Sequence, residues 1–508
     1  MSKRPCVAPK AVVHHTGVVA HIAHCLASTK DVLSLLEALP RHALDAPLAA
    51  LQTLLTTPET LRVVARYWPR ACIEEFDGGD TVTVLAALPI FRSISIERLQ
   101  KLHDVLRDAS SEPATTLYAA TIDFASKWGH KVASIDNIVL RESDDMDALP
   151  RTLRLCTGLD SIDVSIDTSD AASVASILHA AQHVKRITLS AHSDNGYDCG
   201  DWRPLFADWL ASGHATHLCL DRLMCDDTVG FVRAIAAATS LTSLHLDNAS
   251  RLMQGLVDAA TPLKAITQLR LCVPHDDIFA EPFVSSLVNS SALRTLELDT
   301  LSENGPEVDL SFVLTLLPRL VVLEKLSIET CVLRAEPALL VAPAPRHLRT
   351  LNVQYCVIQD DDMWLGLFHW TSQSPCLTTV TLNFCNLVSN KPALFAGYLR
   401  QWITGGVTSV DLVNCDLNEK SVIAIATALC HTHRTSSSTF RLWLDFDPLL
   451  VGLNSYQVLF EALATCTGVK IEVFQDRSLE RERITELTSA LHLRLEAIDT
   501  QRIIVYSP

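Results

Sequence analysis

The side chains best suited to bind a metal in this 508-residue sequence are found among its cysteines and histidines. One local group is Cys430-His431-Thr432-His433, and another joins Cys25 to the neighbouring His15, His21 and His24. Sulfur and imidazole are ligands of structural zinc, but such sites usually pair their cysteines as CxxC, and that spacing does not occur here. A histidine near a helix end can also interact with free backbone carbonyls. We therefore interpret both groups as structural and expect no metal site.

Side chains that could support catalysis or nucleotide binding are equally scarce. Asp360-Asp361-Asp362 could hold a cation, but acids directly before an apolar segment also suit the positive end of a helix dipole. The sequence contains no phosphate-binding glycine loop and neither the HExxH nor the GxSxG motif of hydrolases. We predict a protein that is not an enzyme and that needs no cofactor.

The elements that position these residues follow from a repeated apolar pattern. The pattern L-x-x-L-x-L, in strong or weak form, recurs thirteen times at intervals of 24 to 32 residues. The thirteen units begin at Ile135, Leu159, Val184, Ala215, Leu241, Ile266, Leu293, Leu323, Leu348, Leu377, Val407, Thr439 and Gly468. A period of this length indicates a stack of strand-plus-helix units.

A second regularity involves four cysteines. Cys331, Cys356, Cys385 and Cys415 each lie eight residues after the first residue of their unit. The pattern L-x-x-L-x-L-x-x-C resembles the leucine-rich-repeat family, nearest its ribonuclease-inhibitor-like and cysteine-containing branches. The resemblance implies that this position is buried at the turn leaving each strand. Stacked strands lie about 5 Å apart, so such a column would not form a tetrahedral metal cage.

The resemblance implies an α/β leucine-rich-repeat solenoid, with parallel strands on the concave face and helices on the convex face. Helix-start signals between the strands agree with it: Asp227 and Asn418 precede apolar segments as N-caps, and Glu281-Pro282 places proline in a first turn. The solenoid is expected to span residues 131–475, and residues 476–508 are expected to form a C-terminal capping helix and strand.

The N-terminal region lacks the repeat pattern and reads as short helices. Residues 15–55 resemble an F-box, a small helical module that docks on the adaptor subunit of a cullin-type ubiquitin ligase. The residues that carry this resemblance, and would contact the adaptor, are Val18, Val19, Ile22, Leu26, Asp31, Val32 and Leu35. We expect an F-box-like helical region at 1–76 and a helical connector and cap at 77–130. The alternative is that all these helices only cap the array.

The surface expected to bind a partner is the concave face. Strand side chains alternate, so the third, fifth and seventh residues of each unit should lie on this face. The candidate binding residues are His245, Asp247, Arg270, Glu297, Asp299, Lys325, Glu329, Asn352, Gln354, Asn383, Asp411, Trp443, Asp445, Glu472 and Phe474. Trp443 and Phe474 are the aromatic members, and aromatic side chains commonly anchor protein interfaces.

The charge balance limits the class of partner. The formal net charge is −16, which disfavours a nucleic-acid partner, and no apolar run is long enough to cross a membrane. We predict a cytoplasmic interaction scaffold, with the nucleus left open, whose concave face binds another protein. Its finer form is the substrate-recognition subunit of a ubiquitin ligase. The alternative is a regulatory or cytoskeletal scaffold, for example a GTPase regulator.

Overall fold

The computed structural model divides into two compact units, Met1–Leu241 and Thr242–Pro508. The residues that it describes are 16–76, 78–109, 119–141, 147–167, 171–191, 197–198, 203–224, 227–258, 263–273, 292–300, 308–334, 341–343, 345–358, 361–385, 390–430, 432–434, 438–445, 451–474, 479–497 and 502–508. The helix expected after Glu281-Pro282 lies outside these residues.

The first unit begins with helices and continues as alternating strands and helices. Its helices are α1 (Thr16–His24), α2 (Thr29–Ala38), α3 (Ala46–Thr56), α4 (Pro58–Tyr67), α5 (Gly78–Ala87), α6 (Leu99–Ala109), α7 (Ala119–Trp128), α8 (Ala148–Leu155), α9 (Ala171–Ala180), α10 (Arg203–Ala211) and α11 (Thr228–Ala237). Its strands are β1 (Arg70–Cys72), β2 (Ser93–Ile96), β3 (Val132–Arg141), β4 (Ser161–Asp167), β5 (Arg186–Ala191), β6 (Tyr197–Asp198), β7 (His217–Asp221) and β8 (Leu223–Met224).

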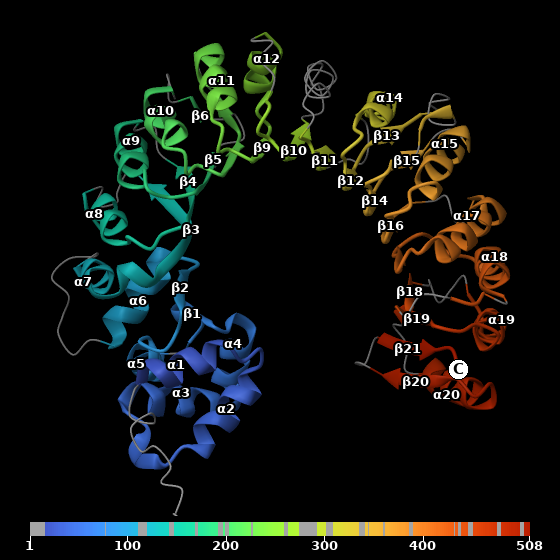
Figure 1. Ribbon diagram of the computed structural model, residues 1–508, viewed down its shortest axis with the longest axis horizontal. Helices are drawn as coiled ribbons and strands as arrows, with labels where there is room; N and C mark the ends of the chain where they lie inside the picture. Colours follow the sequence, from blue (N-terminus) through green and yellow to red (C-terminus); the bar gives the residue numbers. More distant parts are fainter. Residues whose placement is uncertain are drawn as a thin grey trace, which may run out of the picture. The chain divides into compact units, whose positions relative to one another are not determined.

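The strands of the first unit pair in parallel in the order β1, β2, β3, β4, β5, β7. Strands β1 and β2 lie upstream of residue 131, so the parallel row begins earlier than the first L-x-x-L-x-L segment. Helices α6 to α11 line one side of this row (Figure 1). The fold of this unit is therefore a stack of strand-plus-helix repeats that already starts at Arg70.

The N-terminal helices pack on one another and on the start of the row. Helix α3 contacts α2, α4 and α5. The side chain of Ser28 accepts a hydrogen bond from the backbone N–H of Asp31, as expected for the N-cap of α2. Two polar contacts join the α1–α2 segment to the first strands: His24 Nε2 lies 2.6 Å from the Ile90 carbonyl, and the Trp68 indole donates to the Leu26 carbonyl.

The second unit continues the same alternation. Its main strands are β9 (Ser243–Asp247), β10 (Gln268–Val273), β11 (Thr295–Thr300), β12 (Lys325–Glu329), β14 (Thr350–Gln354), β16 (Thr379–Asn383), β17 (Ser409–Leu412), β18 (Phe440–Asp445) and β19 (Val469–Phe474). Its helices are α12 (Ser250–Asp258), α14 (Phe312–Leu316), α15 (Asp361–Ser372), α17 (Pro392–Gly405), α18 (Glu419–Leu429) and α19 (Leu453–Ala464). A short parallel pair, β13 (Val332–Leu333) and β15 (Val357–Ile358), follows two of the strands.

The main strands of this unit form one parallel row, in which each main strand pairs with the next main strand along the chain. Each of the thirteen expected repeat segments contains a strand, and in ten of them the strand begins two residues after the segment does. The fourth and sixth residues are buried because they point toward the helices, as with Leu351 and Val353 in β14. The chain therefore has the leucine-rich-repeat fold.

The C-terminal end of the second unit closes with antiparallel strands. Helix α20 (Leu479–Ala490) leads to β20 (Arg494–Ala497) and β21 (Arg502–Tyr506), and β21 lies antiparallel between β20 and β19. The capping helix expected within residues 476–508 is α20, and the backbone enters a left-handed conformation at His492 before β20. The end of the row is thus covered by paired backbone rather than left as an open edge.

The cysteine column is buried at the turns, as the repeat resemblance implied. Cys356 donates through sulfur to the Gln354 carbonyl at 3.1 Å, and Cys385 donates to the Asn383 carbonyl at 3.3 Å. The residue directly before each column cysteine has a positive φ, for example 54° at Asn414. Cys356, Cys385 and Cys415 therefore donate to carbonyls at the strand ends, whereas Cys331 contacts the sulfur of Cys356 at 3.6 Å.

The turn after β1 contains a buried carboxyl group with a testable pH effect. Burial raises the pKa of Glu74, although the backbone N–H of Arg98, which donates at 3.0 Å, lowers it in part. A raised carboxyl pKa stabilises the fold below the unfolded pKa of about 4.3, and this contribution is lost as the pH rises through the folded pKa. We expect Glu74→Gln to raise the melting temperature at pH 7, since the amide oxygen can still accept from Arg98.

The difference between Glu74→Gln and the parent chain should shrink as the pH falls toward 4, because both side chains are then neutral. Parallel thermal unfolding at pH 7, 5.5 and 4 measures it. Glu59→Gln, on an exposed position of α4, is the control and should change the melting temperature little at any pH. A constant or negative difference for Glu74→Gln across these pH values would contradict the assignment.

Candidate functional site

The candidate binding surface is the side of the second unit's strand row that faces away from its helices. In β14 and β16 the burial alternates, so that the third, fifth and seventh residues of each repeat are half-buried while those between them are buried. The register places these residues in lateral rows, for example Glu297, Ser327, Asn352, Thr381 and Asp411. We call this surface the open face.

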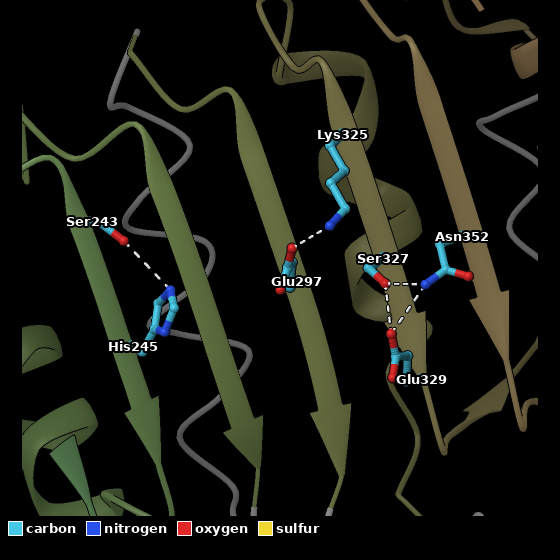
Figure 2. Close-up of polar contacts among 7 residues, drawn as sticks. All are labelled: Ser243, His245, Glu297, Lys325, Ser327, Glu329 and Asn352. Carbon is cyan, nitrogen blue, oxygen red and sulfur yellow. Dashed lines mark hydrogen bonds and ion pairs between the residues drawn. The ribbon is translucent and has the colours of Figure 1, made fainter. Parts of the chain in front are cut away.

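Two separate groups of polar contacts lie across the middle of the open face (Figure 2). The Lys325 ammonium donates to the Glu297 carboxylate at 2.5 Å, between β12 and β11. The Asn352 amide donates to Ser327 Oγ at 2.7 Å and to Glu329 Oε1 at 3.1 Å, and Ser327 also donates to Glu329. Glu329 is thus held by neutral donors, and its negative charge remains available to a partner.

The same face continues through β16 to β19 with a second set of contacts. The Asn383 amide bridges two strands, donating to Gln354 Oε1 at 3.4 Å and accepting from the Val413 N–H. Glu472 is buried and forms ion pairs with Arg441 at 3.2 Å and Lys470 at 3.0 Å. The Arg441 guanidinium also lies over the Trp443 ring, 4.8 Å from its centroid. Trp443 is therefore half-buried against a cation.

Charged groups on the open face shift one another's pKa values. Burial lowers the pKa of Arg270, but the carboxylates of Asp247, Glu297 and Asp299 outweigh it, so the net shift is upward. Burial raises the pKa of Asp411, although Arg441 opposes this shift. The β9–β11 part is therefore a cluster of carboxylates around one guanidinium. His245 belongs to the same part, with its ring 3.4 Å from Ser243 Oγ (Figure 2).

An aromatic pair that the sequence analysis did not select lies at the end of β14 and β16. Tyr355 and Phe384 stack with their ring centroids 4.0 Å apart and their planes 16° apart. Both remain exposed, at 46% and 42%. Both also have a left-handed backbone, with φ of 53° and 52°. Their N–H groups donate to the next strand, at Asn383 and Val413, which fixes the turn.

The position of these two residues in the repeat is a sequence signal that could have identified the pair. Tyr355 and Phe384 each directly precede a cysteine of the column, in the repeat position that adopts a positive φ. A bulky residue in that conformation is a strained outlier, which asparagine or glycine would avoid. Asn248 and Asn414 occupy the equivalent position of other repeats, and so do Thr330 and Arg222, so the aromatic rings and not the backbone set the pair apart. Phe474 is in β19, but its side chain lies outside the described part of the structure.

The F-box-like residues divide into buried and exposed sets. Val19 in α1 and Val32 in α2 are buried, whereas Leu26 and Leu35 are half-buried. Val18 and Ile22 are exposed one helical turn apart on α1. Asp31 is exposed in the first turn of α2. The structure thus leaves two apolar side chains of this region exposed, whereas the other apolar members are half-buried or buried.

Among the residues that the structure describes, no group of three or more His, Cys, Asp or Glu side chains could hold a metal ion. His15, His431 and Asp360 are not among these residues. None of the helices within the described ranges is long and apolar enough to cross a lipid bilayer.

The fold defines a leucine-rich-repeat protein with a polar open face. No family model matches the sequence, and no curated protein matches it. Similar solved structures include internalin C2 from Listeria monocytogenes, at 19% identity, covering 47% of this chain and 84% of that chain with a TM-score of 0.26. The leucine-rich repeat-containing protein LegL7 from Legionella pneumophila is 14% identical, covering 73% and 93%, with a TM-score of 0.30.

A chain of the yeast Rad7 and Elc1 complex is similar at 12% identity, covering 74% of this chain and 79% of that chain, with a TM-score of 0.34. At these identities and scores a likeness says nothing about binding partners. The fold assignment rests on the parallel strand register and the repeated turn geometry described above.

Proposed function

We propose that the chain is a non-catalytic interaction scaffold that binds another protein through the open face of its second unit. The observation that carries this proposal is the Tyr355–Phe384 stack. Two neighbouring aromatic rings that stay this exposed offer apolar surface to a partner, and exposed apolar patches commonly mark interaction sites. The positive φ is a repeated turn feature, shared with Arg222, Thr330 and Asn414, so the site is distinguished by its two exposed, stacked rings.

Interface energetics support the pair as an anchor. Binding energy concentrates in a few large side chains, with tyrosine among the most frequent, and surrounding polar residues exclude water. Gln354 and Asn383 directly precede the two aromatic residues and supply such polar groups. Glu329 is the seventh residue of the preceding repeat, and its charge is compensated only by neutral donors. The partner is thus expected to present an apolar patch next to a basic side chain.

The test places a photo-crosslinking amino acid at position 384 of the full chain, expressed in its own cells, and identifies the protein that it captures. Ile423 on α18 is the control position, because it is exposed to the same extent as Tyr355, at 46%, but lies on a helix. The captured protein is then purified, and its Kd is measured for the parent chain and for Tyr355→Asn, Phe384→Asn and Ile423→Asn.

We expect at least a tenfold loss of affinity for Tyr355→Asn and Phe384→Asn and little change for Ile423→Asn. Asparagine is chosen because it tolerates the left-handed conformation, so both variants should fold at least as well as the parent. Equal affinity for all four chains, or capture only from position 423, would rule out the aromatic pair as the anchor.

We further propose that the N-terminal helices dock on the adaptor of a cullin-type ubiquitin ligase, which would make the chain a substrate receptor. The exposed Val18 and Ile22, beside half-buried Leu26 and Leu35, support this finer proposal. Two exposed apolar side chains one helical turn apart form a small apolar patch that a docked helix could cover. Co-purification of the adaptor with the full chain tests it.

Val18→Asp with Ile22→Asp should abolish adaptor binding without unfolding the chain, because both side chains point outward. The control is Val82→Asp, on the exposed side of α5 in the same helical region. Adaptor that never co-purifies, or that binds both variants alike, would leave α1 and α2 as a cap while the open-face proposal stands on its own test.

A further inference from the structure

A cavity in the first unit is lined by three arginines although the chain as a whole is acidic. Its volume is about 470 Å³, and its lining comprises Arg66, Tyr67, Trp68, Pro69, Arg70, Arg92 and Ser93. The chain carries 58 acidic and 42 basic residues, yet none of these seven residues is acidic. This concentration of positive charge requires a physical explanation.

The cavity is built where two chain segments start neighbouring strands. Arg70 opens β1 and pairs in register with Ser93, which opens β2. The N–H of Arg92 donates to the Pro69 carbonyl at 3.0 Å, so the two segments are held side by side. Arg66 comes from the last turn of α4, and its guanidinium lies 5.0 Å from the centroid of the Tyr67 ring. Three arginines, all of them exposed, thus line one cavity that is formed by two segments held side by side.

The arginines are not neutralised by ion pairs within the described part of the chain. Arg70 and Arg92 form no ion pair there, and Arg66 contacts only the Tyr67 ring. The Glu97 carboxylate accepts a hydrogen bond from the Tyr67 hydroxyl at 2.9 Å. Burial and Glu97 raise the pKa of Asp136. Arg70 is one of three groups that oppose this rise.

We infer that this cavity is a binding site for a phosphate monoester, a function separate from partner binding at the open face. Guanidinium groups donate paired hydrogen bonds to phosphate oxygens, and a dianion offsets the repulsion among three like charges. The cavity is larger than a bare phosphate requires and is of the size of small-molecule sites. Tyr67 and Trp68 also line the cavity, beside the arginines.

The same chemistry could come from a free metabolite or from a phosphorylated side chain of a protein. Calorimetry with the full chain distinguishes these sources, using inorganic phosphate, phosphoserine, phosphotyrosine and a phosphoserine peptide with its unphosphorylated form. Saturable binding of the phosphate esters supports the site. Tighter binding of the phosphopeptide than of phosphoserine identifies a protein source, and equal or weaker binding identifies a free metabolite.

Arginine variants test the location of the site. Arg92→Gln and Arg70→Gln should each weaken phosphate-ester binding at least tenfold, and the affinity of the parent should fall as salt is raised. The matched control is Arg62→Gln, one turn earlier on α4 and outside the cavity lining, which should bind like the parent. Absence of saturable binding to any phosphate ester, or an equal loss in Arg62→Gln, would overturn the inference.

Discussion

Alanine in place of Gly158 is expected to destabilise the first unit by about 3 kcal/mol, at the upper end of what an overpacked site costs. A Cβ at this position would lie 2.3 Å from the carbonyl oxygen of His130. The obstructing atoms are backbone, so no side chain can rotate away. Gly129 faces the same contact from the other side, where a Cβ would lie 2.2 Å from the Leu155 carbonyl oxygen.

The two glycines act as one feature, because they let the turns before β3 and β4 touch. The N–H of Gly158 donates to the Gly129 carbonyl at 3.3 Å. The double variant Gly129→Ala/Gly158→Ala should therefore cost less than the sum of the single variants. Urea unfolding, followed by the change in midpoint at constant slope, measures all three chains.

The control for this prediction is Gly397→Ala in α17. A Cβ there has no neighbour within 4 Å, and alanine favours a helix over glycine, so stability should rise by up to about 1 kcal/mol. If Gly158→Ala unfolds at the same urea concentration as the parent, the close approach of the two turns does not exist in solution.

The repeat array could be predicted from sequence because its signal is periodic and redundant. Each unit places leucine, isoleucine or valine at positions that must be buried together. A unit can therefore still be recognised when one of these positions holds a different residue. The weak unit that starts at Gly468 shows this, since Ile471 and Val473 alone mark β19. The cysteine column was predictable for the same reason.

Features that depend on one or two residues could not be predicted in this way. Strand β1 is three residues long and carries no L-x-x-L-x-L pattern, and the four-residue β2 carries only a weak form, with Phe91, Ile94 and Ile96 at the apolar positions, which was not among the thirteen units. The arginine cavity joins residues 66–70 to residues 92–93, which become neighbours only through the β1–β2 pairing. The Tyr355–Phe384 stack needs two adjacent turns with positive φ. In all three cases the information lies in the pairing of segments rather than in either segment alone.

Two buried tryptophans on the helices are expected to respond differently to replacement by phenylalanine. Trp209 in α10 and Trp402 in α17 are both buried to the same degree. The Trp209 indole donates to the Val184 carbonyl at 2.6 Å. The Trp402 indole has no hydrogen-bond partner among the described residues. Trp209→Phe therefore removes a hydrogen bond, whereas Trp402→Phe removes an unsatisfied buried donor.

The cost of an unsatisfied buried N–H is about 1–3 kcal/mol, and phenylalanine relieves it only at position 402. We expect Trp402→Phe to destabilise the chain less than Trp209→Phe by at least about 1 kcal/mol. Alanine should cost about 3–5 kcal/mol at either position, because each change leaves a large cavity. At position 402 that cavity would open beside Phe368 and Phe395, whose rings now meet the indole edge to face.

The comparison separates packing from hydrogen bonding, because the two phenylalanine variants lose the same volume from equally buried sites. Urea midpoints of the four single variants supply the measurement. Equal costs for the two phenylalanine variants would mean that the Trp402 N–H is satisfied in solution, for example by a bound water. A larger cost at 402 would instead show that the aromatic cluster of α15 and α17 depends on the full indole, so that ring packing, not donor satisfaction, decides the stability of this part of the repeat array.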